Sequence, residues 1–199
     1  MKTIYAFDFD GTITKSDTLI DFISFVYGKT RMFWGFLLNL PWLLLMKLGI
    51  YDNGKTKQRV FAHFFKGMTI EQFNSHCQRF AENNGDIFRE EMSELLSKLT
   101  AERAETYVIS ASIVNWVRPF FKSEDVCVIG TEAEVIEGHL TGRFSTPNCY
   151  GDEKVRRLLS IRPDLDNCHL VAYGDSHGDF QLLSMADEAY YKGVKEIRR

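Results

Sequence analysis

The stretch Asp8-Phe9-Asp10-Gly11-Thr12 says more about the fold of this chain than any other part of it. Two carboxylates stand two positions apart, directly after the apolar residues 4–7, which have the character of a buried strand. In α/β sheets, functional side chains gather beyond the carboxyl ends of the strands. A carboxylate pair at such a place can hold a divalent cation, or one carboxylate can attack a substrate while the other moves a proton.

The composition is that of an ordinary globular protein, with 45% hydrophobic and 26% charged residues in a chain of 199. A net charge of −3 provides no basic field, so we expect no nucleic-acid partner. The cysteines form no C-x-x-C pair, which argues against a zinc site or a disulfide framework and favours a reducing compartment. The first predicted strand begins at Thr3, so we expect no signal peptide and a cytoplasmic protein.

Short apolar segments predict a doubly wound, mainly parallel α/β sheet. The predicted strands are residues 3–8, 106–110, 126–130, 170–173 and 188–191. Two alternating segments on either side of Glu137-Gly138 predict a β-hairpin from residues 131–136 and 139–144.

An insertion is predicted between the first two strands. They lie about 95 residues apart, whereas a parallel crossover needs only about a dozen. We therefore expect a catalytic core formed by residues 1–14 and 84–199, and an inserted helical cap over residues 15–83. Within the cap, the pattern from Thr69 to Gln72 resembles a capping box that opens a helix.

The cap contains an apolar stretch, residues 32–46, without a charged side chain. It is shorter than the ~20 residues that span a bilayer as a helix, and Asn39 and Pro41 interrupt it. We interpret it as a buried pair of cap helices. The alternatives are an amphipathic segment that rests on a membrane surface, which would make the protein membrane-associated, and a true bilayer span.

Further polar groups follow predicted strands or begin a predicted helix. Ser110-Ala111-Ser112 comes directly after the second strand, Lys154 stands at the start of a helical pattern, and Asp175 and Asp179 follow the fourth strand. The carboxyl ends of parallel strands share one edge of a sheet, so these groups are expected to converge on Asp8 and Asp10. Each motif alone is weak evidence, but their common order along the chain is specific.

This order, D-x-D-G-T, a Ser at a strand end, a Lys and then G-D-x-x-x-D, resembles the haloacid dehalogenase-type phosphatases. The position of the cap and the hairpin further resemble the phosphoserine phosphatase branch. The resemblance implies a Mg²⁺-dependent hydrolase that acts on a phosphomonoester through an aspartyl-phosphate intermediate.

The resemblance also implies roles for individual residues. Asp8 would be the nucleophile and Asp10 the group that moves protons, while Ser110 and the Ala111 amide would bind phosphoryl oxygens. Lys154 would neutralise charge on the nucleophile and the phosphate.

The implied Mg²⁺ ligands are the carboxylates of Asp8 and Asp175 and the backbone carbonyl of Asp10. The supporting residues would be Gly11, Thr12 and Asp179, of which the last would assist the metal shell or pair with Lys154.

Two cap residues fall where the phosphoserine phosphatase branch carries substrate-binding groups. Arg59 would contact a substrate phosphate or carboxylate, or lie on a solvated helix face. Asp17 would be an acid of the pocket or the cap of a helix.

The substrate follows less directly from the sequence. A small phosphoserine-like phosphomonoester is expected, although Ser110-Ala111-Ser112 departs from the Ser-Gly-Gly of phosphoserine phosphatases. Residues 149–155 and the apolar cap are similar to those of bacterial lipid-phosphate phosphatases of the phosphatidylglycerophosphatase C type, which makes a lipid phosphate the alternative.

Two other classes of protein fit parts of the pattern. A non-catalytic phosphoacceptor would share the order of acid pair, Ser and Lys, but not the large insertion or G-D-x-x-x-D. Residues 49–56 match the P-loop pattern G-x-x-x-x-G-K-[ST], which would indicate a nucleotide binder only if the motif joined a strand to a helix.

Overall fold

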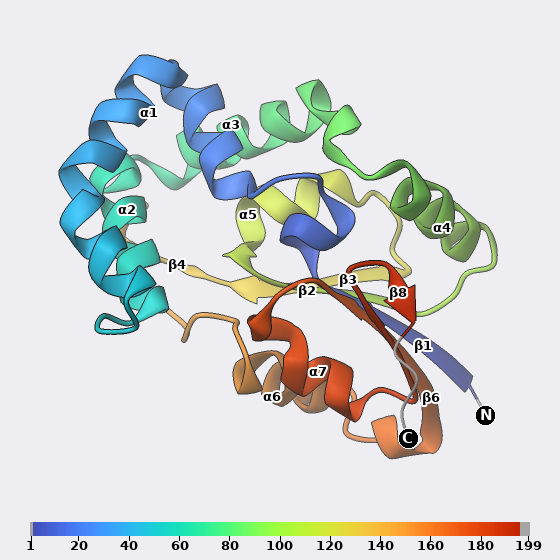
Figure 1. Ribbon diagram of the computed structural model, residues 1–199. Coiled ribbons are helices and arrows are strands. Elements are labelled where there is room, and N and C mark those ends of the chain that lie inside the picture. Colours follow the sequence, from blue (N-terminus) through green and yellow to red (C-terminus); the bar gives the residue numbers. More distant parts are fainter. Residues whose placement is uncertain (1, 196–199) are drawn as a thin grey trace.

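The computed structural model describes residues 2–195 and has a central sheet between helical layers (Figure 1). The strand order is β3-β2-β1-β6-β7-β8, with β1–β3, β6 and β7 parallel and β8 antiparallel to β7. The bounds of these strands are β1 Lys2–Phe7, β2 Thr106–Ile113, β3 Val126–Thr131, β6 Cys168–Gly174, β7 Glu188–Tyr191 and β8 Val194–Lys195. The prediction of a mainly parallel α/β sheet is confirmed.

Helices cover both faces of the sheet. In Figure 1, α6 and α7 lie below it, while α4 and α5 lie above it and α1, α2 and α3 lie further out on that side. Their bounds are α1 Thr18–Lys47, α2 Asn53–Phe65, α3 Ile70–Asn83, α4 Glu90–Ala101, α5 Val114–Val117, α6 Asp152–Ile161 and α7 Phe180–Met185.

The two faces of the sheet are buried in separate apolar clusters. In β1, Ile4 and Ala6 belong to the cluster between the sheet and helices α6 and α7. Phe7 belongs to the cluster on the other face, which includes residues of α1, α2, α3 and α4. Successive strand residues point to opposite faces, so a strand covered on both sides is apolar throughout. This is why the strands were visible in the sequence as uninterrupted apolar runs.

Several predicted boundaries need correction. β1 ends at Phe7, so Asp8 lies in the turn that follows it, and Thr131 belongs to β3 rather than to the hairpin. β2 runs past Ser110 to Ile113, with a register shift in its pairing with β3 between these two residues. The sequence did not predict β8, because two exposed residues carry no apolar pattern.

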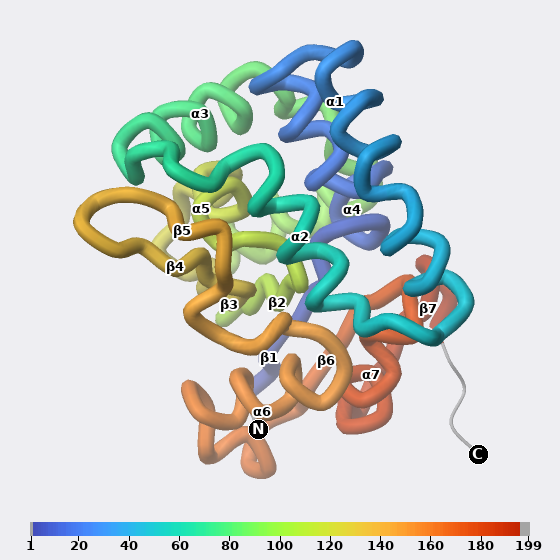
Figure 2. Tube along the Cα trace, turned by 90° about the vertical axis from the view of Figure 1, so that its left-hand side faces the viewer, coloured from blue at the N-terminus to red at the C-terminus, as the bar shows by residue number. Residues whose placement is uncertain are grey.

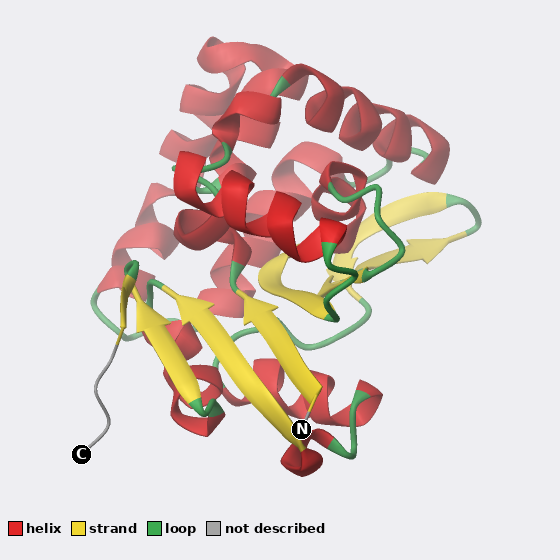
Figure 3. Cartoon of the chain, turned by 90° about the vertical axis from the view of Figure 1, so that its right-hand side faces the viewer, coloured by secondary structure: helices red, strands yellow, loops and turns green. Residues whose placement is uncertain are grey.

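The predicted hairpin forms from β4 Ala133–Ile136 and β5 His139–Phe144, and it stands away from the main sheet (Figure 3). It lies beside α2 (Figure 2), where the Phe144 amide donates to Gln58 Oε1 at 2.9 Å. Thr69 caps α3 through a hydrogen bond from the Gln72 amide at 3.2 Å, as its sequence pattern predicts. The division into a core and a cap over residues 15–83 stays a prediction.

Residues 32–46 form part of one helix, so the interpretation as a buried helix pair is wrong. α1 bends at Gly28, whose φ of +76° is not helical, and continues through Pro41. The Asn39 side chain donates to the Gly35 carbonyl at 2.9 Å and is buried, which keeps a polar group satisfied inside the helix. No helix within residues 2–195 combines the length and apolar character needed to cross a membrane.

Candidate active site

A pocket of about 570 Å³ opens beyond the carboxyl ends of β1, β2 and β6. The side chains of Asp8, Asp10, Lys154 and Asp175 line its polar end, together with the backbone around Ala111. The structure therefore brings the groups of the sequence motifs to one place, as the order of strands predicts.

The first two carboxylates lie at the turn Phe9–Ile13, with Asp8 directly before the turn and Asp10 inside it. The Asp8 amide donates to the Tyr173 carbonyl at 2.9 Å, which extends the contact between β1 and β6 by one residue. Gly11 has a φ of +81°, and a Cβ at this position would stand 2.4 Å from Asp175 Oδ2. Only glycine satisfies both conditions, so it permits the turn to approach the Asp175 carboxylate.

Lys154 is buried between two carboxylates. Its Nζ donates to Asp8 Oδ1 at 2.5 Å and to Asp179 Oδ1 at 2.6 Å, and its side chain is 2% exposed. Burial alone would lower the pKa of this ammonium group, but the two carboxylates raise it above its ordinary value. Burial raises the pKa of Asp8 to about 7, against the opposing effect of Lys154.

Asp179 fixes the loop after β6. Its Oδ2 accepts hydrogen bonds from the Asp175 amide at 3.2 Å, the Ser176 amide at 3.0 Å and the Ser176 hydroxyl at 2.8 Å. Although burial acts in the opposite direction, Lys154 and Ser176 lower the pKa of Asp179. Asp179 is therefore a charged structural centre that positions its neighbours.

Asp10 is held by donors from two elements. Its Oδ1 accepts from the Thr18 amide at 2.8 Å and the Thr18 hydroxyl at 2.5 Å. Its Oδ2 accepts from the hydroxyls of Ser112 at 2.5 Å and Ser110 at 3.3 Å. Because the Trp116 indole N–H donates to the Thr18 oxygen at 3.2 Å, the Thr18 hydroxyl is oriented to donate to Asp10.

The donor set fits a hard divalent cation. Oxygens of Asp8, Asp175 and Asp179 lie within 4.8 Å of one another. Among residues 2–195, no hydrogen bond reaches the Asp175 carboxylate, whose pKa is raised by burial and by the charge of Asp179. Carboxylate oxygens are the ligands that Mg²⁺ prefers. Asp179 is the weakest candidate, because its Oδ1 accepts from Lys154 and its Oδ2 already accepts three hydrogen bonds. By contrast, Asp8 Oδ2 accepts only a 3.3 Å hydrogen bond from Thr12.

The remaining predicted site residues of the core lie close to this centre. Thr12 donates through its hydroxyl to Asp8 Oδ2 at 3.3 Å. Ser110 is fully buried and accepts a hydrogen bond from the Ser112 amide at 2.9 Å, so its hydroxyl faces Asp10 rather than the open pocket.

Asp17 lies at the rim of the pocket and also caps a helix. Its carboxylate accepts a hydrogen bond from the Leu19 amide at 2.9 Å at the start of α1, and the residue lines the pocket. Desolvation by the surrounding protein and the nearby Asp10 carboxylate raise the pKa of Asp17. The two roles considered for this residue are thus compatible.

Arg59 is exposed and is not among the residues that line the pocket, so its position favours the exposed helix face over the contact with substrate. Its guanidinium stacks on the Trp42 ring at 4.1 Å from the centroid and so joins α2 to α1. Lys57 enters the site instead, with its Nζ 2.9 Å from the Ala111 carbonyl oxygen and 3.4 Å from Ser112 Oγ. Two positions along a helix differ by about 200° around its axis, so Lys57 and Arg59 face opposite ways.

Sequence reasoning also missed Arg89, which lines the pocket from the start of α4. Its Nε donates to the Gly11 carbonyl at 3.1 Å. The two residues are 78 positions apart, and no local pattern marks such a contact.

One wall of the pocket is apolar. It is formed by side chains of α1 and α2, namely Leu19, Ile20, Phe36, Leu43, Met46 and Val60. The pocket therefore has an apolar wall as well as the polar side chains described above.

The P-loop interpretation of residues 49–56 is wrong. These residues join α1 to α2, whereas a P-loop joins a strand to a helix. Asp52 caps α2 by accepting a hydrogen bond from the Lys55 amide at 2.8 Å. This amide at the start of the helix therefore already has a partner within the chain and is not free to bind a phosphate.

Comparison with known proteins places the chain in a family. A family model described as haloacid dehalogenase-like hydrolase matches residues 5–184. The protein CicA of Caulobacter vibrioides is 31% identical over 194 residues, which cover 95% of this chain and 85% of CicA. The chain belongs to the haloacid dehalogenase-like hydrolases.

Solved structures share its fold. A Bordetella pertussis protein of unknown function has a TM-score of 0.80 at 16% identity, covering 95% of this chain and 89% of that one. A phosphoserine phosphatase, determined as a phospho-aspartyl intermediate analogue, has a TM-score of 0.62 at 18% identity, with coverage of 94% and 85%. The fold is thus one that phosphoserine phosphatases also adopt.

Replacing Lys154 tests the buried cluster. Lys154→Met is expected to lower the free energy of unfolding at neutral pH by about 3–5 kcal/mol, because two buried carboxylates lose their counter-ion. Urea unfolding in metal-free buffer measures this loss. Lys55→Met, the same substitution at an exposed position of α2, should change the free energy by less than about 0.5 kcal/mol. Equal effects of the two substitutions would contradict a stabilising role of the cluster.

Proposed function

We propose that this protein is a Mg²⁺-dependent phosphomonoester hydrolase that acts through an aspartyl-phosphate at Asp8. The observation that carries the proposal is the position of Asp8, which ion-pairs with Lys154 and lies with Asp10 and Asp175 at the polar end of the pocket. The hydrolase family of the chain supports the reaction class.

In the first step, one oxygen of the Asp8 carboxylate attacks phosphorus and the bond to the leaving oxygen breaks. Asp10 gives its proton to the leaving oxygen, so the products are an alcohol and an aspartyl-phosphate. The hydrogen bonds from Thr18 and Ser112 hold the Asp10 carboxyl group at this position.

In the second step, Asp10 removes a proton from water, and the water oxygen attacks phosphorus. The bond to Asp8 breaks, which releases inorganic phosphate and restores the carboxylate. A non-catalytic phosphoacceptor would not need such a base, so the firmly held Asp10 favours turnover over stable phosphorylation.

Positive charge supports both steps. A Mg²⁺ ion at the carboxylates of Asp8 and Asp175 would offset the repulsion between nucleophile and phosphate. Lys154 orients Asp8 and supplies a fixed cation, while Lys57 adds a second ammonium group beside Ala111. Phosphoryl transfer depends mainly on such positioning and charge stabilisation.

Two substrate classes fit the pocket. Lys15, Lys57 and Arg89 line it and could hold the carboxylate of a small phosphoserine-like substrate. A small polar substrate would leave the apolar wall around Phe36 and Leu43 without a contact. This wall favours a phosphomonoester with an apolar tail, as in a lipid phosphate. We favour the second class, with the first as the competing candidate.

The nucleophile and the metal can be tested together. Asp8→Asn should lower phosphate release from p-nitrophenyl phosphate by at least about a thousandfold, because the amide is not a nucleophile. Chelation by EDTA should abolish the wild-type activity, and added Mg²⁺ should restore it. Asp152→Asn, the same change in the exposed first turn of α6, should be silent. Full activity of Asp8→Asn would refute the nucleophile.

Lys57 and Arg59 offer a matched pair on one helix. Lys57→Met should lower kcat/KM for p-nitrophenyl phosphate by at least about tenfold, because a cation near the phosphoryl group is lost. Arg59→Met removes a contact with Trp42 outside the pocket and should change kcat/KM by less than about twofold. A larger loss of kcat/KM in Arg59→Met than in Lys57→Met would instead identify Arg59 as the cation that binds the substrate.

Substrate chain length distinguishes the two classes. For n-alkyl phosphates below their micelle concentrations, kcat/KM should rise by up to about fourfold per methylene until the apolar wall is covered. Phosphoserine should be a poor substrate. Leu43→Ser should reduce the gain per methylene and leave the hydrolysis of phosphoserine unchanged. If phosphoserine were preferred over every alkyl phosphate, the small polar substrate would replace the lipid-like one.

A further inference from the structure

The outer side of α1 and the turn that follows it carry an unusual set of exposed apolar residues. We call them the outer strip: Phe33, Trp34, Leu37, Leu38, Leu40, Leu44, Leu48 and Ile50. Each is at least 42% exposed, and Leu38 and Leu48 reach 69% and 71%. Single exposed apolar side chains are normal on proteins, but a contiguous set of this size marks a surface that contacts something else.

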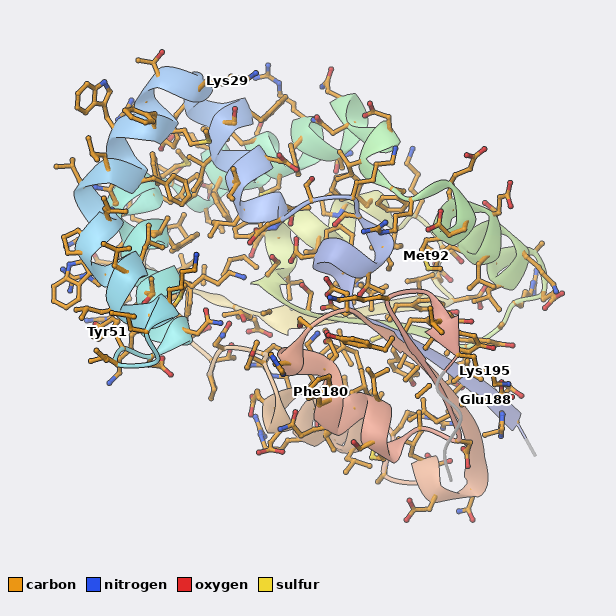
Figure 4. All side chains as sticks on the ribbon, viewed as in Figure 1. Lys29, Tyr51, Met92, Phe180, Glu188 and Lys195 are labelled. Atoms are coloured by element: carbon orange, nitrogen blue, oxygen red, sulfur yellow. The ribbon has the colours of Figure 1, made fainter. Side chains whose placement is uncertain are left out.

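The spacing of these residues places them on one side of the helix. Residues 33, 37, 40, 44 and 48 recur at intervals of three and four, which is one face of an α-helix. Trp34 and Leu38 lie next to this face and are also exposed, whereas Gly35 and Asn39 are buried and Phe36 lines the pocket. Figure 4 shows side chains projecting outward from α1 along the edge that runs between the labelled Lys29 and Tyr51.

The charges of this segment have one sign. Residues 22–51 contain Lys29, Arg31 and Lys47 and no acidic residue, although the whole chain has a net charge of −3. All three basic side chains are exposed, and they stand near the two ends of the outer strip. An apolar helix face flanked by basic residues and carrying an exposed Trp is typical of helices that lie in the interface of a membrane.

We propose that the outer strip docks on the surface of a bilayer that contains anionic lipids. Apolar side chains such as Trp34 and Leu38 would enter the boundary between headgroups and acyl chains, while Lys29, Arg31 and Lys47 contact lipid phosphates. Charge argues against a second copy of the chain as the occupant. If the outer strips of two copies packed together, their basic side chains would repel one another, because residues 22–51 contain no carboxylate to pair with them.

Docking in this way would set the pocket beside the lipid. Phe36 and Leu43 line the pocket from the helix that carries Leu37 and Leu44 on its outer strip. A lipid-like substrate would then reach the apolar wall without crossing water. The docking surface itself does not depend on the proposed hydrolase activity, because the test below measures vesicle binding alone.

Flotation with vesicles tests the proposal. The full chain should float with vesicles of two parts phosphatidylcholine to one part phosphatidylglycerol, and float much less with pure phosphatidylcholine. The double variant Trp34→Glu, Leu38→Glu should reduce the bound fraction by at least about tenfold, because it removes inserted apolar area and adds repulsion. Lys29→Gln and Lys47→Gln should each weaken binding about fivefold, and high salt should act in the same direction.

Matched controls separate docking from misfolding. Ile161→Glu replaces an apolar residue that is 48% exposed on α6, across the sheet from α1, and should leave flotation unchanged. Circular dichroism and hydrolysis of p-nitrophenyl phosphate should be the same in the Trp34, Leu38 double variant as in the wild type. The proposal fails if the wild type does not float with anionic vesicles, or if the double variant floats as well as the wild type. It also fails if light scattering shows a dimer that the double variant abolishes.

Discussion

The active-site edge of this protein depends on one buried cation, the Lys154 ammonium group between the carboxylates of Asp8 and Asp179. A buried charge without a partner costs several kcal/mol, so each member of the cluster is tolerable only when the others are in place. The three residues come from the end of β1, the start of α6 and the loop after β6, and 146 positions separate the first two. The polar site therefore forms only when these three segments of the chain pack together. Asp175 lies beside this cluster without a hydrogen bond to its carboxylate among residues 2–195, so the fold leaves one acid of the centre free for an ion.

Close backbone approach is the second constraint. A Cβ at Gly11 would stand 2.4 Å from Asp175 Oδ2, and one at Gly174 would stand 2.5 Å from Asp179 Cβ. Gly11 lets the first turn approach the Asp175 carboxylate, whereas Gly174 lets the loop after β6 fold back so that Asp179 packs against the backbone of its own motif. The contact at Gly11 is the one that joins D-x-D-G-T to G-D-x-x-x-D. Either motif alone would leave acids at the end of a strand without the second turn that completes the donor set.

Much of the fold and the polar centre could be predicted from sequence, because their causes are local. Strands buried on both faces read as apolar runs, and groups at the ends of parallel strands share an edge. The choice between Lys57 and Arg59 could not be predicted in the same way. It depends on where α2 begins, which the Asp52 cap decides, and on the distant Trp42 ring that receives the guanidinium. Arg89 likewise reaches the Gly11 carbonyl only through the tertiary fold.

The sequence wrongly predicts that residues 32–46 are buried, and this error has a more general cause. A helix that is apolar on every side is normally buried on every side, and composition alone cannot show which side is left open. Here one side of α1 covers the pocket through Phe36 and Leu43, while the other side is exposed through Leu37 and Leu44. Neighbouring residues on a rigid helix move together, so anything that holds the outer strip also holds the apolar wall of the pocket. Evolutionary selection for a substrate with an apolar tail, and selection for docking on a membrane that contains such substrates, would then act on the same turns of α1. Under the proposed substrate class and the proposed docking surface, this shared constraint would account for the apolar composition of α1.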